Sequence, residues 1–239
     1  MDSFTVQKKS FLKDLLIPLQ LLNIQEAGLV VDESEIYTIA TKGQNDCSFY
    51  GSSPLVVSNF EGKLNFADIF LLRKVIDLLN TDLITFKINK NHVILNDESG
   101  KLQFKLFLVN DAAIKNSPAK KEHFLNFVSD IDLSLNKNEL EQLLKLKSLA
   151  ISTKALYINK VESGVEFLFT DKTKTYVDEF RKTFEKDISN LDPLIINAEV
   201  LDWFGKDIDA LKILHNKNKK TYLIFNIDRK YYLVSQLEK

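Results

Sequence analysis

The sequence predicts an α+β fold built from two tandem copies of one unit. The main observation is that both halves of the 239-residue chain end in three short strands joined by turns, at residues 82–109 and 209–237. A helical segment that follows an asparagine precedes each set of strands, and a polar stretch containing a proline separates the halves. Two units of about 120 residues each have an ordinary domain size.

Polar and apolar residues alternate in these closing strands, and Asn, Asp, Ser and Gly residues between them indicate tight turns. The predicted strands are Leu83–Ile88, His92–Asn96 and Lys101–Val109 in the first half and Ala210–His215, Thr221–Ile227 and Lys230–Leu237 in the second. The repeat is therefore one of element order, with loops of unequal length.

A short helix is predicted before each set of closing strands. The first covers Phe66–Leu79 after Asn65, and the second covers Ala198–Ile208 after Asn197. Asparagine is a favourable N-cap, and an acidic residue follows it in the first turn of both helices. The apolar runs Pro54–Val57 and Leu194–Ile196 predict a strand ahead of each helix.

The front parts of the halves also match. A strand and a helix open each half, and we expect Pro18 to kink the first helix or end it at Ile17. Asn136 and Glu139 form a capping-box pattern at the start of the corresponding second helix. Further strands are predicted at Leu29–Val31, Ile36–Thr41 and Cys47–Tyr50, and at Leu156–Asn159, Val165–Thr170 and Thr175–Phe180.

These patterns divide the chain into a first domain at 1–111, a polar connector at 112–124 and a second domain at 125–239. The connector carries Pro118 and the pair Lys120 and Lys121.

Composition excludes several classes of function. Lys and Arg number 32 against 33 Asp and Glu, and a net charge of −1 excludes a basic protein that coats nucleic acid by charge alone. One cysteine, Cys47, and three separated histidines do not suggest a metal centre. Phosphate-binding glycine loops and hydrolase motifs are lacking. We therefore expect no cofactor, no metal and no catalytic residues.

The N-terminus lacks the apolar core of a secretory signal, and the apolar stretch from Leu12 to Leu22 is too short and too polar to span a bilayer. We expect a cytoplasmic protein that does not enter a membrane.

The element order and several stretches resemble the DNA sliding clamp family, which includes proliferating cell nuclear antigen and the clamps of tailed phages. These stretches are Asp82–Lys87, Leu102–Asp111, Leu156–Thr170 and Tyr231–Val234. The resemblance covers essentially the whole chain. It implies two tandem clamp domains, with helices on the inner face and antiparallel sheets outside, that assemble into a ring.

The resemblance also implies a function and partners. A two-domain clamp chain forms a homotrimer that encircles double-stranded DNA without sequence preference and tethers the replicative DNA polymerase. It is loaded by a clamp loader and is not an enzyme. The length and the lysine-rich, arginine-poor usage look closest to a phage clamp, which would place the protein in the host-cell cytoplasm. A cellular clamp would be associated with the nucleoid.

The same resemblance suggests three groups of site residues. Basic residues on the helices would face DNA: Lys8, Lys9, Lys13, Arg73, Lys74, Lys137, Lys145, Lys147 and Lys206. The edge strands Lys101–Val109 and Thr175–Arg181 would pair between subunits, with contacts from Phe104, Leu106, Tyr176 and Phe180. A partner peptide would enter an apolar pocket formed by Ile114, Tyr232 and Val234.

Each assignment has a simpler alternative. Lysines on amphipathic helices are commonly a solvated face, as the i,i+4 pair Glu141 and Lys145 illustrates. The interface and pocket residues could instead fill the core of their own domain. Two other functions also remain open: a duplicated α+β enzyme with a site between its halves, and a clamp-like accessory subunit that does not encircle DNA.

Overall fold

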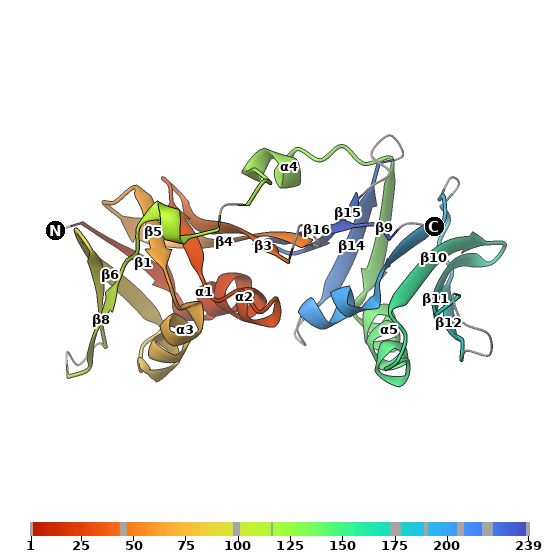
Figure 1. The fold of residues 1–239 in the computed structure, drawn as a ribbon, viewed down its shortest axis with the longest axis horizontal. Coiled ribbons are helices and arrows are strands. Elements are labelled where there is room, and N and C mark those ends of the chain that lie inside the picture. The colour runs from red at the N-terminus through yellow and green to blue at the C-terminus, as the bar shows by residue number, and fades with distance from the viewer. Residues whose placement is uncertain are drawn as a thin grey trace. The chain divides into compact units, whose positions relative to one another are not determined.

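The computed structural model describes residues 2–43, 47–97, 101–115, 117–172, 178–188, 191–204, 208–216 and 222–237. The chain divides into two compact units, Met1–His123 and Phe124–Lys239 (Figure 1). Each combines antiparallel strands with a few helices, so the protein is α+β, as the sequence predicts. The residues 112–123 of the predicted connector lie within the first unit.

The first unit opens with strand β1 and a helical segment and then alternates strands with one further helix. Its strands are β1 Ser3–Gln7, β2 Ala27–Val31, β3 Glu35–Lys42, β4 Cys47–Ser58, β5 Gly62–Phe66, β6 Leu83–Asn89, β7 His92–Asn96 and β8 Gln103–Phe107. Its helical segments are α1 Lys8–Phe11, the π-helical η1 Leu12–Leu16, α2 Ile17–Leu21, α3 Ile69–Leu78, the 3-10 turn η2 Asp111–Ala113 and the start of α4 Lys121–Leu125.

The long strand β4 joins the two sheets of the first unit. Its first part, from Cys47 to Pro54, pairs antiparallel with β3, and its last part, from Leu55 to Ser58, pairs antiparallel with β1. The sequence predicts two strands here, but one continuous strand serves both sheets. The pairing order is therefore β8-β7-β6-β1-β4-β3-β2-β5, antiparallel throughout.

The opening helix of the first unit continues past Pro18 because the turn before it widens into a π-turn. In a regular α-helix the carbonyl of Asp14 would accept a hydrogen bond from residue 18, which as proline has no N–H. The carbonyl oxygen of Asp14 lies instead against β4, where a Cβ on Gly51 would approach it to 2.4 Å. Glycine at position 51 therefore permits this close packing of helix and strand.

The second helix of the first unit begins later than the sequence suggests. Asn65 does not cap it but lies in β5, paired with Gly28 of β2. The N-cap is Asp68, whose side chain accepts a hydrogen bond from the backbone N–H of Leu71 at 2.8 Å. The predicted cap at Asn65 is wrong because the segment from Gly62 to Phe66 completes a sheet ladder before the helix starts.

The second unit repeats the pairing of the first in two four-stranded groups, but among its described residues no ladder corresponds to the β1–β4 pairing of the first unit. One has the order β16-β15-β14-β9 and the other β12-β11-β10-β13. The strands are β9 Ile131–Asn136, β10 Ala155–Val161, β11 Gly164–Thr170, β12 Phe180–Phe184, β13 Leu194–Asn197, β14 Ala210–His215, β15 Tyr222–Ile227 and β16 Lys230–Ser235. Strand β12 starts where the predicted strand Thr175–Phe180 ends, and residues 173–177 lie outside the described residues.

The two helices of the second unit contrast in regularity. The capping box of α5 (Lys137–Leu149) is confirmed: Asn136 accepts from the N–H of Glu139 at 3.1 Å, and Glu139 accepts from the N–H of Asn136 at 2.8 Å. The second is a 3-10 helix, η3 Ala198–Trp203, capped by Asn197, so it is shorter than the predicted Ala198–Ile208.

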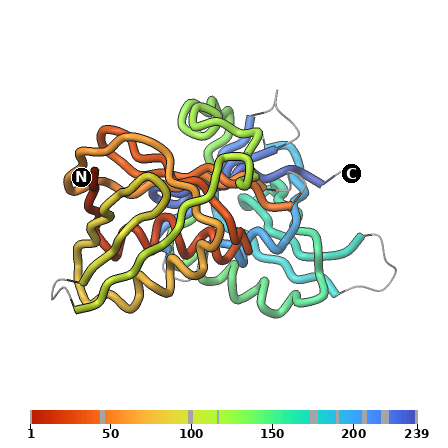
Figure 2. The backbone as a smooth tube through the Cα atoms, turned by 60° about the vertical axis from the view of Figure 1, so that its left-hand side comes forward, coloured from red at the N-terminus to blue at the C-terminus, as the bar shows by residue number. Residues whose placement is uncertain are grey.

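The core of each unit lies between its strands and helices and is rich in aromatic rings. In the first unit the rings of Phe4 and Phe86 stack at 4.6 Å. In the second, Phe204 packs against Phe225 and Tyr232 at 5.3 and 5.1 Å. The backbone trace of Figure 2 shows the closing strands of the first unit side by side, with helix α3 beneath them.

Candidate functional site

The predicted DNA-facing residues of the first opening helix differ in their contacts. The Lys8 ammonium donates to the backbone carbonyls of Leu79 at 2.6 Å and Asp77 at 3.2 Å, so it closes the C-terminal end of α3. Lys13 is half-buried, whereas Lys9 is exposed. Of these three lysines, Lys9 presents its charge most openly to solvent.

Helix α3 buries Ile69, Leu72, Val75 and Ile76 and turns its opposite face to solvent. On that face Arg73 forms an ion pair with Asp77 at 3.6 Å and donates to the side chain of Gln20. Lys74 is exposed. The charge of Arg73 is thus partly compensated within the unit, and Lys74 is the more open cation.

The lysines of α5 divide in the same way. Lys147 is held by Asp202 at 2.6 Å, with a side chain only 18% exposed. Lys137 makes a longer contact to Asp209 at 3.7 Å, and Lys145 is exposed. Lys206 lies outside the described residues. The open cations on the helices are therefore Lys9, Lys74, Lys137 and Lys145.

Each unit has a sheet edge at the position where the sequence suggests a subunit contact. In the described part of the chain β8 pairs only with β7, and β12 pairs only with β11. Phe104 and Leu106 on β8 and Phe180 on β12 are half-buried. Tyr176 lies outside the described residues. Both strands leave backbone groups that another strand could pair with.

Large apolar side chains that the sequence reasoning missed are exposed on β8 and at the ends of α3 and α5. Phe107 on β8 is 64% exposed, and Leu78 at the end of α3 is 63% exposed. In the second unit, where α5 packs against β12, Leu149 and Ile151 are 65% and 86% exposed. A leucine on the polar face at a helix end is the sequence signal that could have identified Leu78 and Leu149.

The predicted partner-pocket residues are all buried. Tyr232 and Val234 lie in the core of the second unit, and the hydroxyl of Tyr232 donates to the carbonyl of Trp203 at 3.3 Å. Ile114 is 7% exposed and belongs to the first unit. Tyr232 and Val234 thus have the burial of ordinary core-strand residues, as the simpler alternative suggested.

A hollow of about 340 Å³ lies beside the connector in the first unit. The segment Leu22–Glu26, the end of β3 and Lys115 line it. The Lys115 ammonium donates to the carbonyl of Gly43 at 2.7 Å, which holds the connector at its rim. The sequence contains no local signal for this hollow, because segments far apart in the chain build it.

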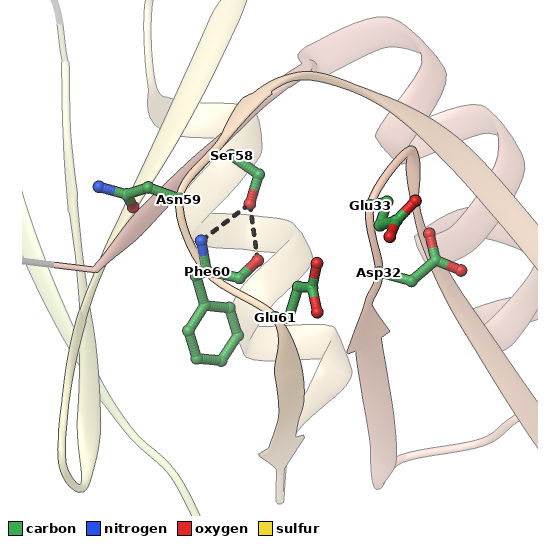
Figure 3. A pocket seen from close by; sticks show the side chains of 6 residues that line it. All are labelled: Asp32, Glu33, Ser58, Asn59, Phe60 and Glu61. Carbon is green, nitrogen blue, oxygen red and sulfur yellow. Dashed lines mark hydrogen bonds between the residues drawn. The ribbon is translucent and has the colours of Figure 1, made fainter.

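A second hollow, of about 540 Å³, lies between the β2–β3 turn and the β4–β5 turn (Figure 3). Asp32, Glu33 and Glu61 supply three carboxyl groups to its lining, next to the ring of Phe60. Ser58 stabilises one wall, because its hydroxyl donates to the carbonyl of Phe60 at 2.7 Å and accepts from the Phe60 N–H at 3.1 Å. Carboxylates repel phosphate, so this hollow does not suit a nucleic-acid backbone.

A charged cluster joins the connector to the first unit. The Lys121 ammonium lies 2.6 Å from Oε1 of Glu35, 3.1 Å from Oδ2 of Asp32 and 4.4 Å from the ring centroid of Tyr37. The hydroxyl of Tyr50 donates to the same Glu35 oxygen at 3.0 Å. The sequence reasoning did not assign these residues, which are as many as 89 positions apart.

The cluster shifts the ionisation of its members. Burial and the neighbouring Glu35 carboxylate raise the pKa of Tyr50 to about 12, against opposing contributions from Ser52 and Lys121. Partial burial alone would raise the pKa of Asp32, but hydrogen bonds from Ser34, Glu35 and Lys121 lower it overall. Burial alone would lower the pKa of Lys121, and the two carboxylates raise it instead.

The described residues contain neither a metal-binding cluster nor a membrane-spanning helix. Within the described ranges, no three His, Cys, Asp or Glu side chains are arranged to hold a metal ion. No helix among the described residues combines the length and the apolar character needed to cross a membrane.

The two repeated units, with their antiparallel sheets and paired helices, give the chain the fold of the DNA sliding clamps. The chain of A. fulgidus PCNA, solved with the C-terminal region of FEN-1, is similar over 100% of this chain and 99% of that chain. Its TM-score is 0.77, at 14% sequence identity.

The beta chain of DNA polymerase III from Streptococcus pneumoniae is similar over 100% of this chain but 66% of its own length. The TM-score is 0.73 at 17% identity. The DnaN sliding clamp of Bartonella birtlesii, solved with griselimycin, also has a TM-score of 0.73, at 14% identity and over 65% of its length. No protein-family model matches the chain, and no curated protein sequence matches it.

Proposed function

We propose that this chain is a DNA polymerase processivity factor: a sliding clamp that encircles double-stranded DNA and tethers a replicative polymerase. The observation that carries the proposal is the likeness to A. fulgidus PCNA over 100% of this chain and 99% of that chain. Both units of the repeat take part in that likeness, so the proposal does not rest on a single shared domain. The action is topological and needs no catalytic group, because encirclement raises the local concentration of the polymerase.

The proposed ring is a homotrimer of six units, in which β8 of one protomer pairs with β12 of the next. Both strands are sheet edges in the described residues, and both would be covered in this arrangement. Charge does not decide this pairing, because β8 carries Lys105 and β12 carries both Arg181 and Lys182 after the acidic Asp178 and Glu179. Leu78 and Phe107 from one side and Leu149 and Ile151 from the other would form the apolar part of the contact.

The proposed DNA contacts are the open cations Lys9, Lys74, Lys137 and Lys145. Contacts to phosphate position a duplex without reading its sequence, which is what a sliding protein requires. Three protomers would supply three copies of each lysine, so a chain with a net charge of −1 could still direct a positive face at DNA. Lys8 and Lys147 are assigned to structural contacts instead, because they already bind groups of their own unit.

The polymerase and a clamp loader are the proposed protein partners. Their docking peptide would enter the 340 Å³ hollow beside the connector, which the segment Leu22–Glu26, the end of β3 and Lys115 line. Ile114 lies in the adjoining connector. This role places the protein with DNA in the cytoplasm, or in the host cytoplasm if a phage encodes it.

Loading the protein on a circular plasmid and then linearising the plasmid tests encirclement. A clamp should remain on the closed circle at high salt and leave the linear DNA by sliding off its ends. Retention on both forms would indicate side binding and would reject encirclement. A block at both ends of the linear DNA should restore retention, which separates sliding from simple dissociation.

The mass in solution tests the trimer. A species of three chains is expected at micromolar concentration, whereas a stable species at the single-chain mass of 27.5 kDa would contradict the ring. Ile151→Lys places a charge in the proposed apolar contact and should dissociate the trimer, because Ile151 is 86% exposed and its loss leaves the unit folded. Val128→Lys is the matched control, since Val128 is 73% exposed but lies away from both edges in the sequence.

The salt dependence of DNA binding tests the lysine assignment. Removing one phosphate contact lowers the slope of log K against log salt by about 0.9. Lys74→Ala and Lys145→Ala should therefore reduce the slope, and because the trimer repeats each residue the reduction should reach about 2 to 3 where all copies touch DNA. Lys63→Ala, in a pair with Asp111 at 2.9 Å, should leave the slope unchanged.

A further inference from the structure

The connector is fastened to the first unit at several points along its course. Asp111 binds Lys63 at 2.9 Å and Asn65 at 2.7 Å at one end. The hydroxyls of Ser117 and Thr41 are 2.6 Å apart in the middle, and Ala119 is buried. The chain then reaches Lys121, the first residue of α4.

The contact at Lys121 differs from the others in the number of groups that converge on it. Two carboxylates and one aromatic face surround the single ammonium of Lys121, whose side chain is 27% exposed. Asp111, by comparison, is 73% exposed, and a pair so open to water contributes little to stability. A partly buried ammonium shared by two carboxylates makes stronger, charge-assisted hydrogen bonds.

The carboxylates that accept hydrogen bonds from Lys121 are also held in place by other groups of the first unit. Oδ1 of Asp32 accepts from the backbone N–H groups of Ser34 at 3.2 Å and Glu35 at 3.0 Å, which fixes the β2–β3 turn. The Tyr50 hydroxyl holds the Glu35 carboxylate from β4, and the rings of Tyr37 and Tyr50 are 5.9 Å apart. A preorganised acceptor loses little conformational entropy when the connector docks.

The 340 Å³ hollow lies beside the same connector segment that ends at Lys121. Lys115 forms part of its lining and is six residues before Lys121, and Thr41 belongs both to the lining and to the contact with Ser117. A connector released at Lys121 would therefore loosen one wall of the hollow.

We propose that Lys121 is a positioning residue for partner binding, which clasps the end of the connector to Asp32, Glu35 and Tyr37 and so keeps the wall of the partner hollow in place. The effect on partner affinity rests on the proposed function, whereas the clasp itself is a property of the free protein. The partner is a peptide segment that binds beside the connector, and Lys121 acts on it through the course of the connector rather than by contact.

Amide hydrogen exchange of the intact protein tests the clasp. In Lys121→Met, which keeps an unbranched side chain one atom shorter and removes its charge, the amides of Ala119 and His123 should exchange about tenfold faster. Both amides donate hydrogen bonds in the native protein, to Ser117 at 3.2 Å and to Lys120 at 3.0 Å. Lys121→Arg should retain the protection, and Lys120→Met, at the exposed neighbouring lysine, should leave it unchanged.

Amide hydrogen exchange in β2 and β3 distinguishes a local release of the connector from a general loss of stability. Amides of Ala27–Val31 should keep their protection in Lys121→Met, because the strand pairing does not depend on the connector. Glu35→Gln should weaken the clasp in part, and the double variant with Lys121→Met should add little to Lys121→Met alone. Unchanged exchange at Ala119 and His123, or full additivity of the two changes, would overturn the proposal.

Affinity for two probes tests the consequence for binding: a synthetic peptide of the C-terminal region of FEN-1, and griselimycin. If either binds the wild-type protein, Lys121→Met should weaken it about tenfold and Lys121→Arg should restore it. Equal affinity for wild type and Lys121→Met would overturn the positioning role. If neither probe binds the wild type, the docking site of the proposed function loses its support, while hydrogen exchange still decides the clasp.

Discussion

The two units share most of their strand pairing but fill their helix positions differently. In the first unit the opening helix contains a π-helical turn and continues through Pro18, and the second helix, α3, is regular over ten residues. In the second unit the opening helix, α5, is regular over 13 residues and the second is a six-residue 3-10 helix. Regular and irregular helices thus exchange places between the repeats.

The difference shows that the two units resemble each other in their strand pairing, whereas the type and length of the helices can vary between them. Where α3 buries an aliphatic face, η3 ends in the buried Trp203 and its C-cap Phe204, whose ring packs against Phe225 and Tyr232. Large aromatic side chains bury enough area to replace the missing helical turns. A short helix is therefore sufficient in the second unit.

The largest expected effect comes from removing this aromatic filling. Trp203→Ala should destabilise the second unit by about 3–5 kcal/mol, because Trp203 is 4% exposed and its loss leaves a cavity. Leu72→Ala in α3 is the matched change in the first unit and should cost about 2–5 kcal/mol. Urea unfolding followed by circular dichroism measures both. A cost below about 1 kcal/mol for Trp203→Ala would show that η3 does not depend on aromatic packing.

The next largest loss of stability is expected where the opening helix of the first unit packs closely against β4. Gly51→Ala should cost about 1–3 kcal/mol, because the new Cβ would lie 2.4 Å from the backbone oxygen of Asp14. Gly28→Ala is the control, since its close contacts, Lys63 Cε at 2.4 Å and Asn65 Oδ1 at 2.8 Å, are side-chain atoms rather than backbone. Thermal unfolding compares the two variants. If Gly28→Ala proves the more costly change, the close approach of helix and strand is not the reason for Gly51.

Removal of the helix caps should have smaller effects that differ between the helices. Asn136→Ala breaks a reciprocal capping box and should cost about 1–2 kcal/mol. Asn197→Ala loses one hydrogen bond to Glu199 and should cost about 0.5 kcal/mol, because the helix it caps is short and is held by packing. Denaturant unfolding of both variants checks the order, and equal costs would contradict the distinction between a capped and a packed helix.

The smallest expected effect is a dependence of stability on pH that is specific to the first unit, through Asp32 and Tyr50. The pKa of Asp32 is lowered, so its stabilising contribution is present above its ordinary value of 3.8 and is lost as the pH falls through the lowered value. The pKa of Tyr50 is raised from 10.0 to about 12, so the first unit loses stability as the pH rises between these values.

Trp203 is the only tryptophan and reports on the second unit by fluorescence, while ultraviolet absorbance follows tyrosine ionisation. Tyr50→Phe should remove the alkaline step near pH 12. An unchanged titration in Tyr50→Phe would mean that another tyrosine carries that step.

Sequence reasoning predicted most of the repeat and less of the candidate site. The closing strands of both halves, the capping box at Asn136 and the cap at Asn197 are confirmed, because each depends on neighbouring residues. The cap at Asn65 was wrong, since pairing with Gly28 of β2, far away in sequence, decides the conformation there. The contacts of Lys8 and Lys147 were also missed, because their partners Leu79 and Asp202 are distant in the chain.

The amino-acid sequence by itself determined the closing strands of both halves, the duplication and the near-neutral charge. These are set by local alternation, capping and turn residues, which act over a few positions. Tertiary structure alone decided that β4 serves two sheets, which lysines remain open, and that Lys121 meets Asp32 and Glu35. Such outcomes depend on which distant segments come into contact, and no local pattern in the chain encodes that pairing.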